Sequence, residues 1–200
     1  MAIKKKSNGI KQPKYKSTST ELKMSLMHYF RYKRQGLVAT EVDLGHNGVS
    51  DVLAYVEDKV IEVEVKVSIS DLKSEFINKT KHYAFAKSVT DKYIQRYHIP
   101  NLFYFCVPID LFEKTEKILD ENKSNAGIMV YDPTAGKKFR QGRPMDFISI
   151  QRKSKMLHNQ VLPEIKERII SRICSEVCIF HEKNCEHIVF EHEDQLLFDI

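Results

Sequence analysis

Acidic and basic residues stand close together in two neighbouring segments that have the composition of β-strands. Asp51 lies in the first segment, and Glu64-Val65-Lys66 lies in the second. Side chains alternate between the two faces of a strand, so Glu64 and Lys66 are expected on one face, with Cα atoms roughly 7 Å apart. A short turn makes consecutive strands antiparallel neighbours. Asp51 and Glu64 are therefore expected to converge on one point.

Two converging carboxylates beside a lysine could hold a divalent metal ion. Carboxylate oxygens are ligands that Mg²⁺ prefers, at roughly 2.0–2.1 Å, and the ion keeps sites for water and a phosphate oxygen. Such an ion lowers the pKa of a bound water, and a neighbouring lysine can position that water or stabilise developing charge. The pattern predicts phosphodiester hydrolysis with Mg²⁺ or Mn²⁺. A solvated sheet face that alternates Glu and Lys is the competing interpretation of Glu64 and Lys66.

The elements that must position these residues follow from the hydrophobic periodicity. A helix is expected to begin near Thr18, where Thr18 and Glu21 have the spacing of a capping box, and to end at Gly36. Strands are expected at 37–44, 49–56, 60–67, 101–107 and 127–131. Helices are expected from residue 70 or 71 toward Pro100, near 110–121, and from about 158 to 180. The order α-β-β-β-α-β-α-β-α predicts an α/β fold, with a mixed sheet flanked by helices.

Charge is distributed unevenly along the 200 residues, whose net charge is +5. Residues 1–20 contain six lysines and no acid, and residues 137–155 contain seven basic groups and one acid. Residues 1–17 lack apolar periodicity and are predicted to be a disordered tail, whereas 18–200 are predicted to form a single domain with an acidic C-terminus. Such basic segments predict contact with a polyanion, most simply DNA. For the tail, an ordinary solvated terminus is the alternative.

Several classes of protein are disfavoured by the sequence. No apolar run approaches the roughly 20 residues of a membrane-spanning helix, and no apolar segment follows the N-terminal lysines as it would in a secretory signal. The four cysteines do not form a secreted disulfide framework, which favours a reducing cytoplasm. Neither a phosphate-binding G-x-x-x-x-G-K-[ST] nor a dinucleotide-binding G-x-G-x-x-G motif occurs. We therefore expect no membrane association and no organic cofactor.

A zinc-bearing interaction module is the alternative from another functional class. Cys174, Cys178 and His181 fall at helical spacing, and Cys185 and His187 follow them. Thiolate and imidazole groups could build a zinc site, although no C-x-x-C pair is present. Small cysteines buried on an amphipathic helix are the competing explanation of Cys174 and Cys178.

The succession of segments resembles the PD-(D/E)XK nuclease superfamily, and within it the MmcB-like bacterial DNA-repair proteins. The similar stretches are SDVLAYV, IEVEVKVSISDLKSEF, KTKHYAF and NLFYFCVP, followed by AGIMVYD and the basic QRKSKM. Together they span roughly residues 19–173, and Ser50-Asp51 stands where that family often has Pro-Asp. The resemblance implies a restriction-endonuclease-like core and a Mg²⁺-dependent nuclease acting on DNA in repair.

The resemblance also implies individual roles. Asp51 and Glu64 would bind the metal together with the carbonyl of Val65, and Lys66 would be the catalytic lysine. Glu21 stands where some family members carry an extra acidic ligand, and its alternative role is the capping box.

DNA contacts would come from a helix and from the basic segment. Lys79 and Tyr83 have the spacing of the family's Q-x-x-x-Y motif, with Lys in place of Gln, which suits phosphate contact. Further contacts are expected from Lys137, Lys138, Arg140 and Arg143. Glu41 is a further candidate polar neighbour of the site.

A DNA-binding repair accessory with the nuclease fold and little or no cleavage is the second hypothesis. The joint presence of Asp51, Glu64 and Lys66 favours the nuclease, since an eroded site would have lost one of them. The sequence leaves the oligomeric state open, a homodimer included.

Overall fold

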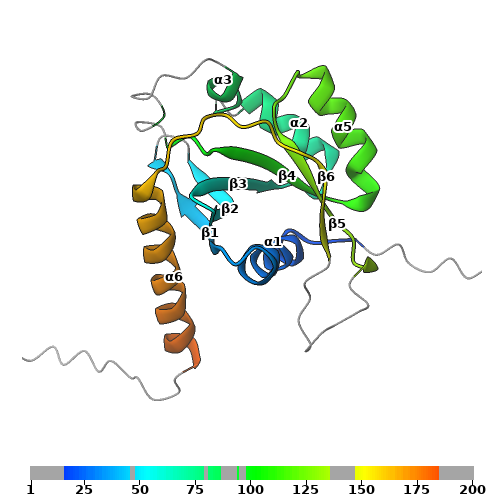
Figure 1. The fold of residues 1–200 in the computed structure, drawn as a ribbon. Coiled ribbons are helices and arrows are strands. Elements are labelled where there is room, and N and C mark those ends of the chain that lie inside the picture. The colour runs from blue at the N-terminus through cyan, green and yellow to red at the C-terminus, as the bar shows by residue number, and fades with distance from the viewer. Residues whose placement is uncertain are drawn as a thin grey trace, which may run out of the picture.

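The fold is α/β, as the sequence predicts, with a six-stranded mixed sheet flanked by helices (Figure 1). The computed structural model describes residues 16–45, 48–78, 81–86, 94, 98–135 and 147–184. The strands are β1 (Leu37–Asp43), β2 (Val49–Val56), β3 (Lys59–Val65), β4 (Leu102–Pro108), β5 (Gly127–Tyr131) and β6 (Ile148–Arg152), in that spatial order. β1, β2 and β3 pair antiparallel, β4 and β5 continue the sheet in parallel, and β6 returns antiparallel. This architecture is consistent with the expected restriction-endonuclease-like core.

Helices cover both faces of the sheet. They are α1 (Ser19–His28), which continues as a π-helical segment (Tyr29–Lys33), then α2 (Ile69–Asn78), α3 (Lys81–Ala86), α5 (Phe112–Glu121) and α6 (Pro163–Asn184). In Figure 1, α1 lies below the sheet, α2, α3 and α5 lie above it, and α6 stands beside β1. The described helices include none that is both long and apolar enough to cross a membrane.

The β2–β3 hairpin fixes the register on which the candidate site depends. Its two turn residues, Glu57 and Asp58, both have positive φ, at 51° and 59°. This combination is that of a type I′ turn, whose twist matches the right-handed twist of the strands. The resulting register places Val52 opposite Val63 and Val56 opposite Lys59. The expected antiparallel hairpin is confirmed.

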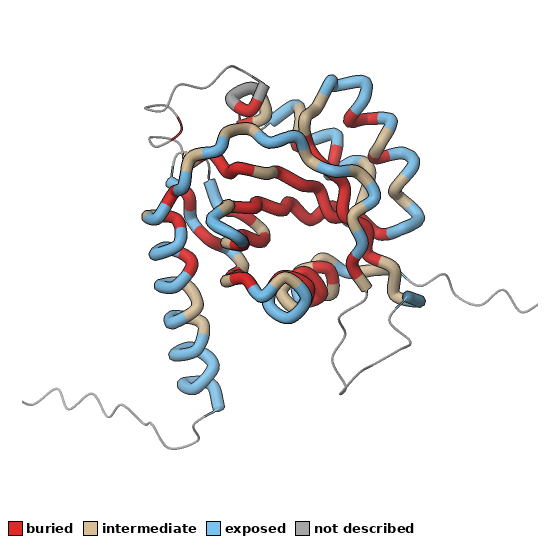
Figure 2. Tube along the Cα trace, in the orientation of Figure 1, coloured by how far each residue is buried: buried red, intermediate tan, exposed pale blue. Residues whose placement is uncertain are grey.

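β3 is buried on both faces. Ile61, Val63 and Val65 pack with α1 in one core cluster, as strand alternation predicts. On the other side, α2 and α5 pack against β4 and β5 in a second cluster. The central strands in Figure 2 are buried along most of their length. Consequently Glu62 and Glu64, on the opposite face of β3, are 0% and 1% exposed and need partners inside the protein.

The observed elements differ from the sequence-based expectation in several places. The helix expected after residue 70 is two helices, α2 and α3. β6 was not expected, because the charge of segment 137–155 obscured the alternating burial of residues 148–152 that is typical of an edge strand. The last helix begins at Pro163, later than expected, since proline favours the first helical turn, and it ends at Asn184.

Candidate active site

Asp51 and Glu64 lie where the pairing of β2 with β3 ends. The last pair in the described register is Val52 with Val63, so Asp51 and Glu64 come next on the two strands. Asp51 Oδ2 accepts a hydrogen bond from the backbone N–H of Val65 at 2.8 Å. Burial raises the pKa of Asp51, and the negative charge of Glu64 raises it further. The two carboxylates are thus close enough to influence each other electrostatically.

A buried ionic cluster surrounds Glu64. It consists of Glu62, Glu64, Glu75, Lys66 and Lys81, each at most 6% exposed. Lys66 Nζ lies 3.5 Å from Glu64 Oε2 and 2.7 Å from Glu75 Oε2. Lys81 Nζ lies 2.8 Å from Glu62 Oε1 and also donates to Glu64 Oε1. The structure therefore brings Lys66 to Glu64, and it adds a second lysine that the sequence did not single out.

The members of the cluster hold one another in the charged form. Burial lowers the pKa of Lys66 and of Lys81, but the neighbouring glutamates outweigh burial and raise both above the ordinary value. Burial raises the pKa of Glu75, yet hydrogen bonds from His82 and Lys66 outweigh it and hold this pKa well below the ordinary range. An isolated buried charge would cost several kcal/mol, so these three groups stay ionised because they are together.

Asp51 forms an ion pair with a lysine outside the buried ionic cluster. Lys23, from α1, lies with its Nζ 2.8 Å from Asp51 Oδ1 and also pairs with Glu41. Partial burial lowers the pKa of Lys23, and the hydrogen bonds to Asp51 and Glu41 outweigh burial and raise it. Glu41 therefore lies next to the site, because it shares Lys23 with Asp51. Its backbone has a positive φ of 53°.

Glu21 is placed in the capping box of α1. Its Oε2 accepts hydrogen bonds from the Thr18 backbone N–H at 2.7 Å and from the Thr18 hydroxyl at 2.9 Å. The capping box predicted from the sequence is thus confirmed. The Glu21 carboxylate, which the resemblance suggested as an extra metal ligand, is engaged in this capping box.

Several expected DNA-contacting residues lie outside the part of the chain that the structure describes. They are Lys79, the side chain of Tyr83, Lys137, Lys138, Arg140 and Arg143, together with the tail before Lys16. Within the described end of the basic segment, Lys153 and Lys155 are exposed. Arg152 instead pairs with Asp120 at 2.7 Å.

The cysteines of α6 are not buried, contrary to the structural explanation considered for them. Cys174 and Cys178 are both exposed, because the second half of α6 extends past the sheet (Figure 1). Cys185 and His187 lie outside the described residues. Among the residues that are described, no three His, Cys, Asp or Glu side chains form a group that could hold a metal ion.

The oxygen donors at the site fit Mg²⁺ in kind, but the lysines already contact them. Asp51, Glu64 and the carbonyl of Val65 would supply the hard oxygen ligands that this ion prefers. The described contacts assign Lys23 and the Val65 N–H to Asp51, and Lys81 and Lys66 to Glu64. A metal ion at this position would compete with these ammonium groups for the carboxylate oxygens.

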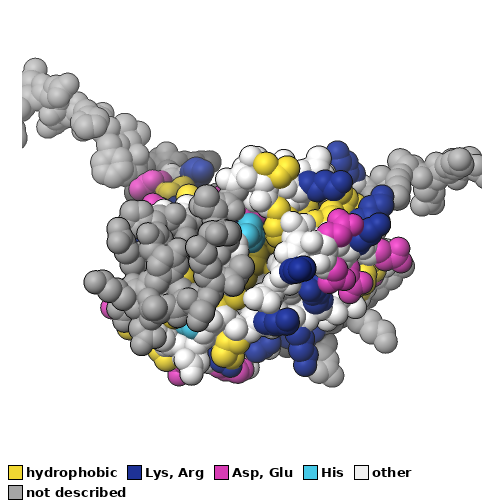
Figure 3. Space-filling model, turned by 90° about the horizontal axis from the view of Figure 1, so that it is seen from above, with side chains coloured by type: hydrophobic (Ala, Val, Ile, Leu, Met, Phe, Trp, Pro, Cys, Tyr) yellow, Lys and Arg dark blue, Asp and Glu magenta, His cyan; other side chains and the backbone are white. Residues whose placement is uncertain are grey.

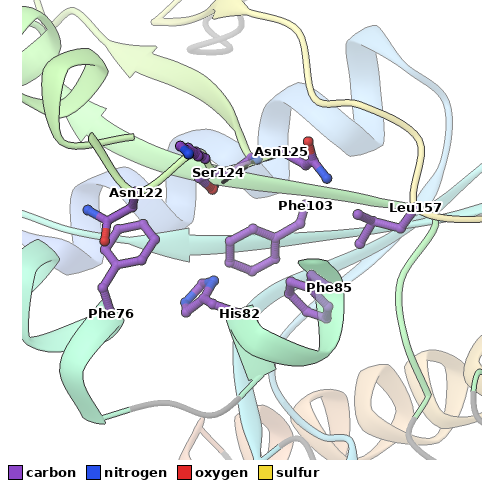
Figure 4. Close-up of a pocket in the computed structure, with 10 residues that line it drawn as sticks. Phe76, His82, Phe85, Phe103, Asn122, Ser124, Asn125 and Leu157 are labelled. Atoms are coloured by element: carbon purple, nitrogen blue, oxygen red, sulfur yellow. Dashed lines mark hydrogen bonds between the residues drawn. The ribbon is translucent and has the colours of Figure 1, made fainter. Parts of the chain in front are cut away.

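A hollow of about 240 Å³ lies beside α2 and α3 (Figure 4). Phe76, Phe85 and Phe103 line it, with Asn122 and Asn125 among its polar residues. His82 also lines it, and its Nε2 lies 3.2 Å from Glu75 Oε1. Seen from above, this face of the molecule carries apolar side chains beside a group of Lys and Arg side chains (Figure 3).

We expect the buried ionic cluster to make stability depend on acid pH. Because the pKa of Glu75 is lower in the folded than in the unfolded protein, its stabilisation is complete above the unfolded pKa, about 4.3, and is lost as pH falls below it. Urea unfolding between pH 7 and pH 3 should show a smaller loss of stability in Glu75→Gln than in the natural protein. The exposed Glu182→Gln serves as control, and equal losses in all three proteins would contradict the prediction.

Comparison with known proteins found similarity among solved structures. No family model and no curated protein matches the chain. Among solved structures, it is similar to the SPO1766 protein of unknown function from Silicibacter pomeroyi, with a TM-score of 0.51 and 12% identity, over 85% of this chain and 94% of that one. An XisH family protein from Nostoc punctiforme PCC 73102 matches at a TM-score of 0.38 and 15% identity, over 56% of this chain and 90% of that one. The first match supports the fold alone.

Proposed function

We propose that the protein is a metal-dependent deoxyribonuclease that hydrolyses phosphodiester bonds, with a role in DNA repair in the cytoplasm. One observation carries the proposal. Asp51 is bound to the backbone of Val65 at 2.8 Å, while Glu64, on the facing strand, lies 3.5 Å from the ammonium group of Lys66. Two carboxylates and a lysine thus lie where the two strands of the hairpin stop pairing.

Each of these groups has a role in the proposed reaction. Asp51, Glu64 and the Val65 carbonyl would hold Mg²⁺ or Mn²⁺, which lowers the pKa of a bound water and offsets phosphate charge. Lys66 would orient the attacking water or stabilise negative charge that develops on the phosphate. Its own position is fixed by Glu75, 2.7 Å away, so the ammonium group is preorganised before substrate arrives.

A DNA-binding repair accessory with little or no cleavage is the second candidate. The observation that favours it is the neutralisation of both carboxylates by lysines, Asp51 by Lys23 and Glu64 by Lys81. If these ion pairs persist on DNA, the fold would bind the nucleic acid without hydrolysing it.

A cleavage assay separates the two candidates. Single-stranded, duplex, branched, mismatched and damaged DNA would each be incubated with Mg²⁺ or Mn²⁺, and with a chelator as control. We expect at least one structure to be cut in the presence of metal and none with the chelator. DNA binding without cleavage of any substrate in the panel would reject the nuclease in favour of the accessory.

The basic segments are predicted to supply sequence-independent affinity for DNA. Each phosphate neutralised on duplex DNA contributes about 0.9 to the slope of log affinity against log salt. Deleting residues 1–16, which removes six lysines, should lower this slope by a few units and weaken binding. The deletion stops before α1, which begins at Ser19, so the fold should persist.

The second basic segment is tested separately. Changing Lys137, Lys138, Arg140 and Arg143 to alanine should also lower the salt slope. The exposed Lys114 and Lys117 of α5, changed to alanine, provide a control outside both segments. A salt slope equal to that of the natural protein would show that the altered segment is only solvated surface.

A further inference from the structure

Lys81 is the principal cation of Glu64, although it lies outside the hairpin that carries the candidate metal ligands. It comes from α3, and its side chain is 3% exposed. It donates to Glu64 Oε1, whereas Lys66 lies 3.5 Å from the other oxygen of that carboxylate and 2.7 Å from Glu75. Lys66 is therefore anchored mainly by Glu75, and Lys81 neutralises Glu64 together with Glu62.

A divalent ion bound to Glu64 would compete with the Lys81 ammonium group for this carboxylate. Two cations a few ångströms apart in a partly dehydrated site repel each other much more strongly than they would in water. Binding of the ion therefore favours withdrawal of one of the two lysines. Because Lys66 has its closest contact with Glu75, Lys81 is the lysine that the ion would displace.

Lys81 has a place to withdraw to. Its Nζ already lies 2.8 Å from Glu62 Oε1 and 5.2 Å from the centroid of the Phe103 ring. A lysine with a second carboxylate and an aromatic face in reach can leave Glu64 without becoming an unpaired buried charge.

We infer that Lys81 is the resident cation of Glu64, which holds this carboxylate before a metal ion binds and retreats to Glu62 when the ion arrives. The inference rests on the proposed function, because it concerns the same metal site. It makes Lys81 a positioning residue that sets the metal affinity, and it assigns Glu62 a role as the acceptor of the displaced lysine.

The test measures Mn²⁺ affinity directly, from the electron paramagnetic resonance signal of the free ion, together with calorimetry. The double variant Glu62→Gln/Lys81→Met removes one negative and one positive charge, so the net charge of the cluster is unchanged. We expect its Mn²⁺ affinity to rise by about tenfold or more, because Glu64 loses the closer of its two lysines and keeps Lys66 at 3.5 Å. Lys81→Arg keeps a cation at this position and should bind Mn²⁺ within a few-fold of the natural protein.

A matched control uses an exposed pair. Lys117 and Glu121 on α5 lie 4.0 Å apart and are 79% and 59% exposed, so Glu121→Gln/Lys117→Met also preserves net charge and should leave Mn²⁺ affinity unchanged. If the natural protein binds Mn²⁺ and the buried double variant binds it no more tightly, the inference is overturned while the proposed function stands. If the buried double variant binds Mn²⁺ tightly and the natural protein does not, the inference is supported. The same result favours the DNA-binding accessory over the nuclease.

Two further outcomes are decisive. If circular dichroism shows that the double variant does not fold, the single variant Glu62→Gln is used instead, because it removes the carboxylate to which Lys81 would retreat. It should weaken Mn²⁺ binding more than the control Asp71→Asn, which removes a charge 3.8 Å from Lys66. Equal effects of these two single variants would overturn the inference. Absence of Mn²⁺ binding in every protein, together with absence of cleavage, would reject the inference and the nuclease alike.

Discussion

Replacing Glu64 by glutamine or Lys66 by methionine is expected to abolish DNA cleavage while DNA binding stays nearly intact. Both substitutions keep the side-chain length, so the buried surroundings are disturbed less than by alanine. Glu64→Gln removes a carboxylate that would hold the metal, and Lys66→Met removes the ammonium group beside it. We expect losses of at least about 10²-fold in the cleavage rate, the magnitude found when one transition-state contact is removed.

Binding should change little, because affinity for DNA comes mainly from phosphate contacts elsewhere. The measurement is single-turnover cleavage beside a binding isotherm at fixed salt, with the exposed Glu182→Gln as control. Alanine at either position should give the same loss of cleavage, provided that circular dichroism shows an intact fold. Full cleavage by the Glu64 and Lys66 variants would remove the basis of the nuclease proposal.

Lys81→Met should destabilise the protein by roughly 3–5 kcal/mol, the cost of breaking a buried ion pair from one side. Without Lys81, Glu62 and Glu64 lose the cation that both share, and both carboxylates are at most 1% exposed. The free energy of unfolding, measured with urea at neutral pH, reports this loss.

The double variant Glu62→Gln/Lys81→Met should recover much of that stability. It removes the carboxylate with the cation, so fewer charges are left buried without a partner, and Lys66 still lies near Glu64. Lys117→Met, at a surface pair 79% and 59% exposed, should change stability by less than about 1 kcal/mol. A similarly small effect of Lys81→Met would mean that Lys81 is not the partner of the buried glutamates.

The sequence alone determined the hairpin and the face on which its polar residues lie. Alternation along 61–66 separated Ile61, Val63 and Val65 from Glu62, Glu64 and Lys66, and the structure separates them in the same way. The capping box of α1 and the bounds of β2 and β5 were also predictable. These features depend on local spacing, which a sequence states directly.

Only the tertiary structure decided which groups neutralise the carboxylates of the β2–β3 hairpin. Lys23 and Lys81 come from helices on either side of the hairpin in sequence, and neither has a distinctive spacing from Asp51 or Glu64. Three buried glutamates, Glu62, Glu64 and Glu75, need more than one lysine to neutralise them. Which lysine does so depends on the break between α2 and α3, which brings Lys81 to them. The exposure of Cys174 and Cys178 was likewise decided by where α6 leaves the sheet. Strand faces follow from local geometry, whereas the partners of a buried charge depend on which helices pack above it.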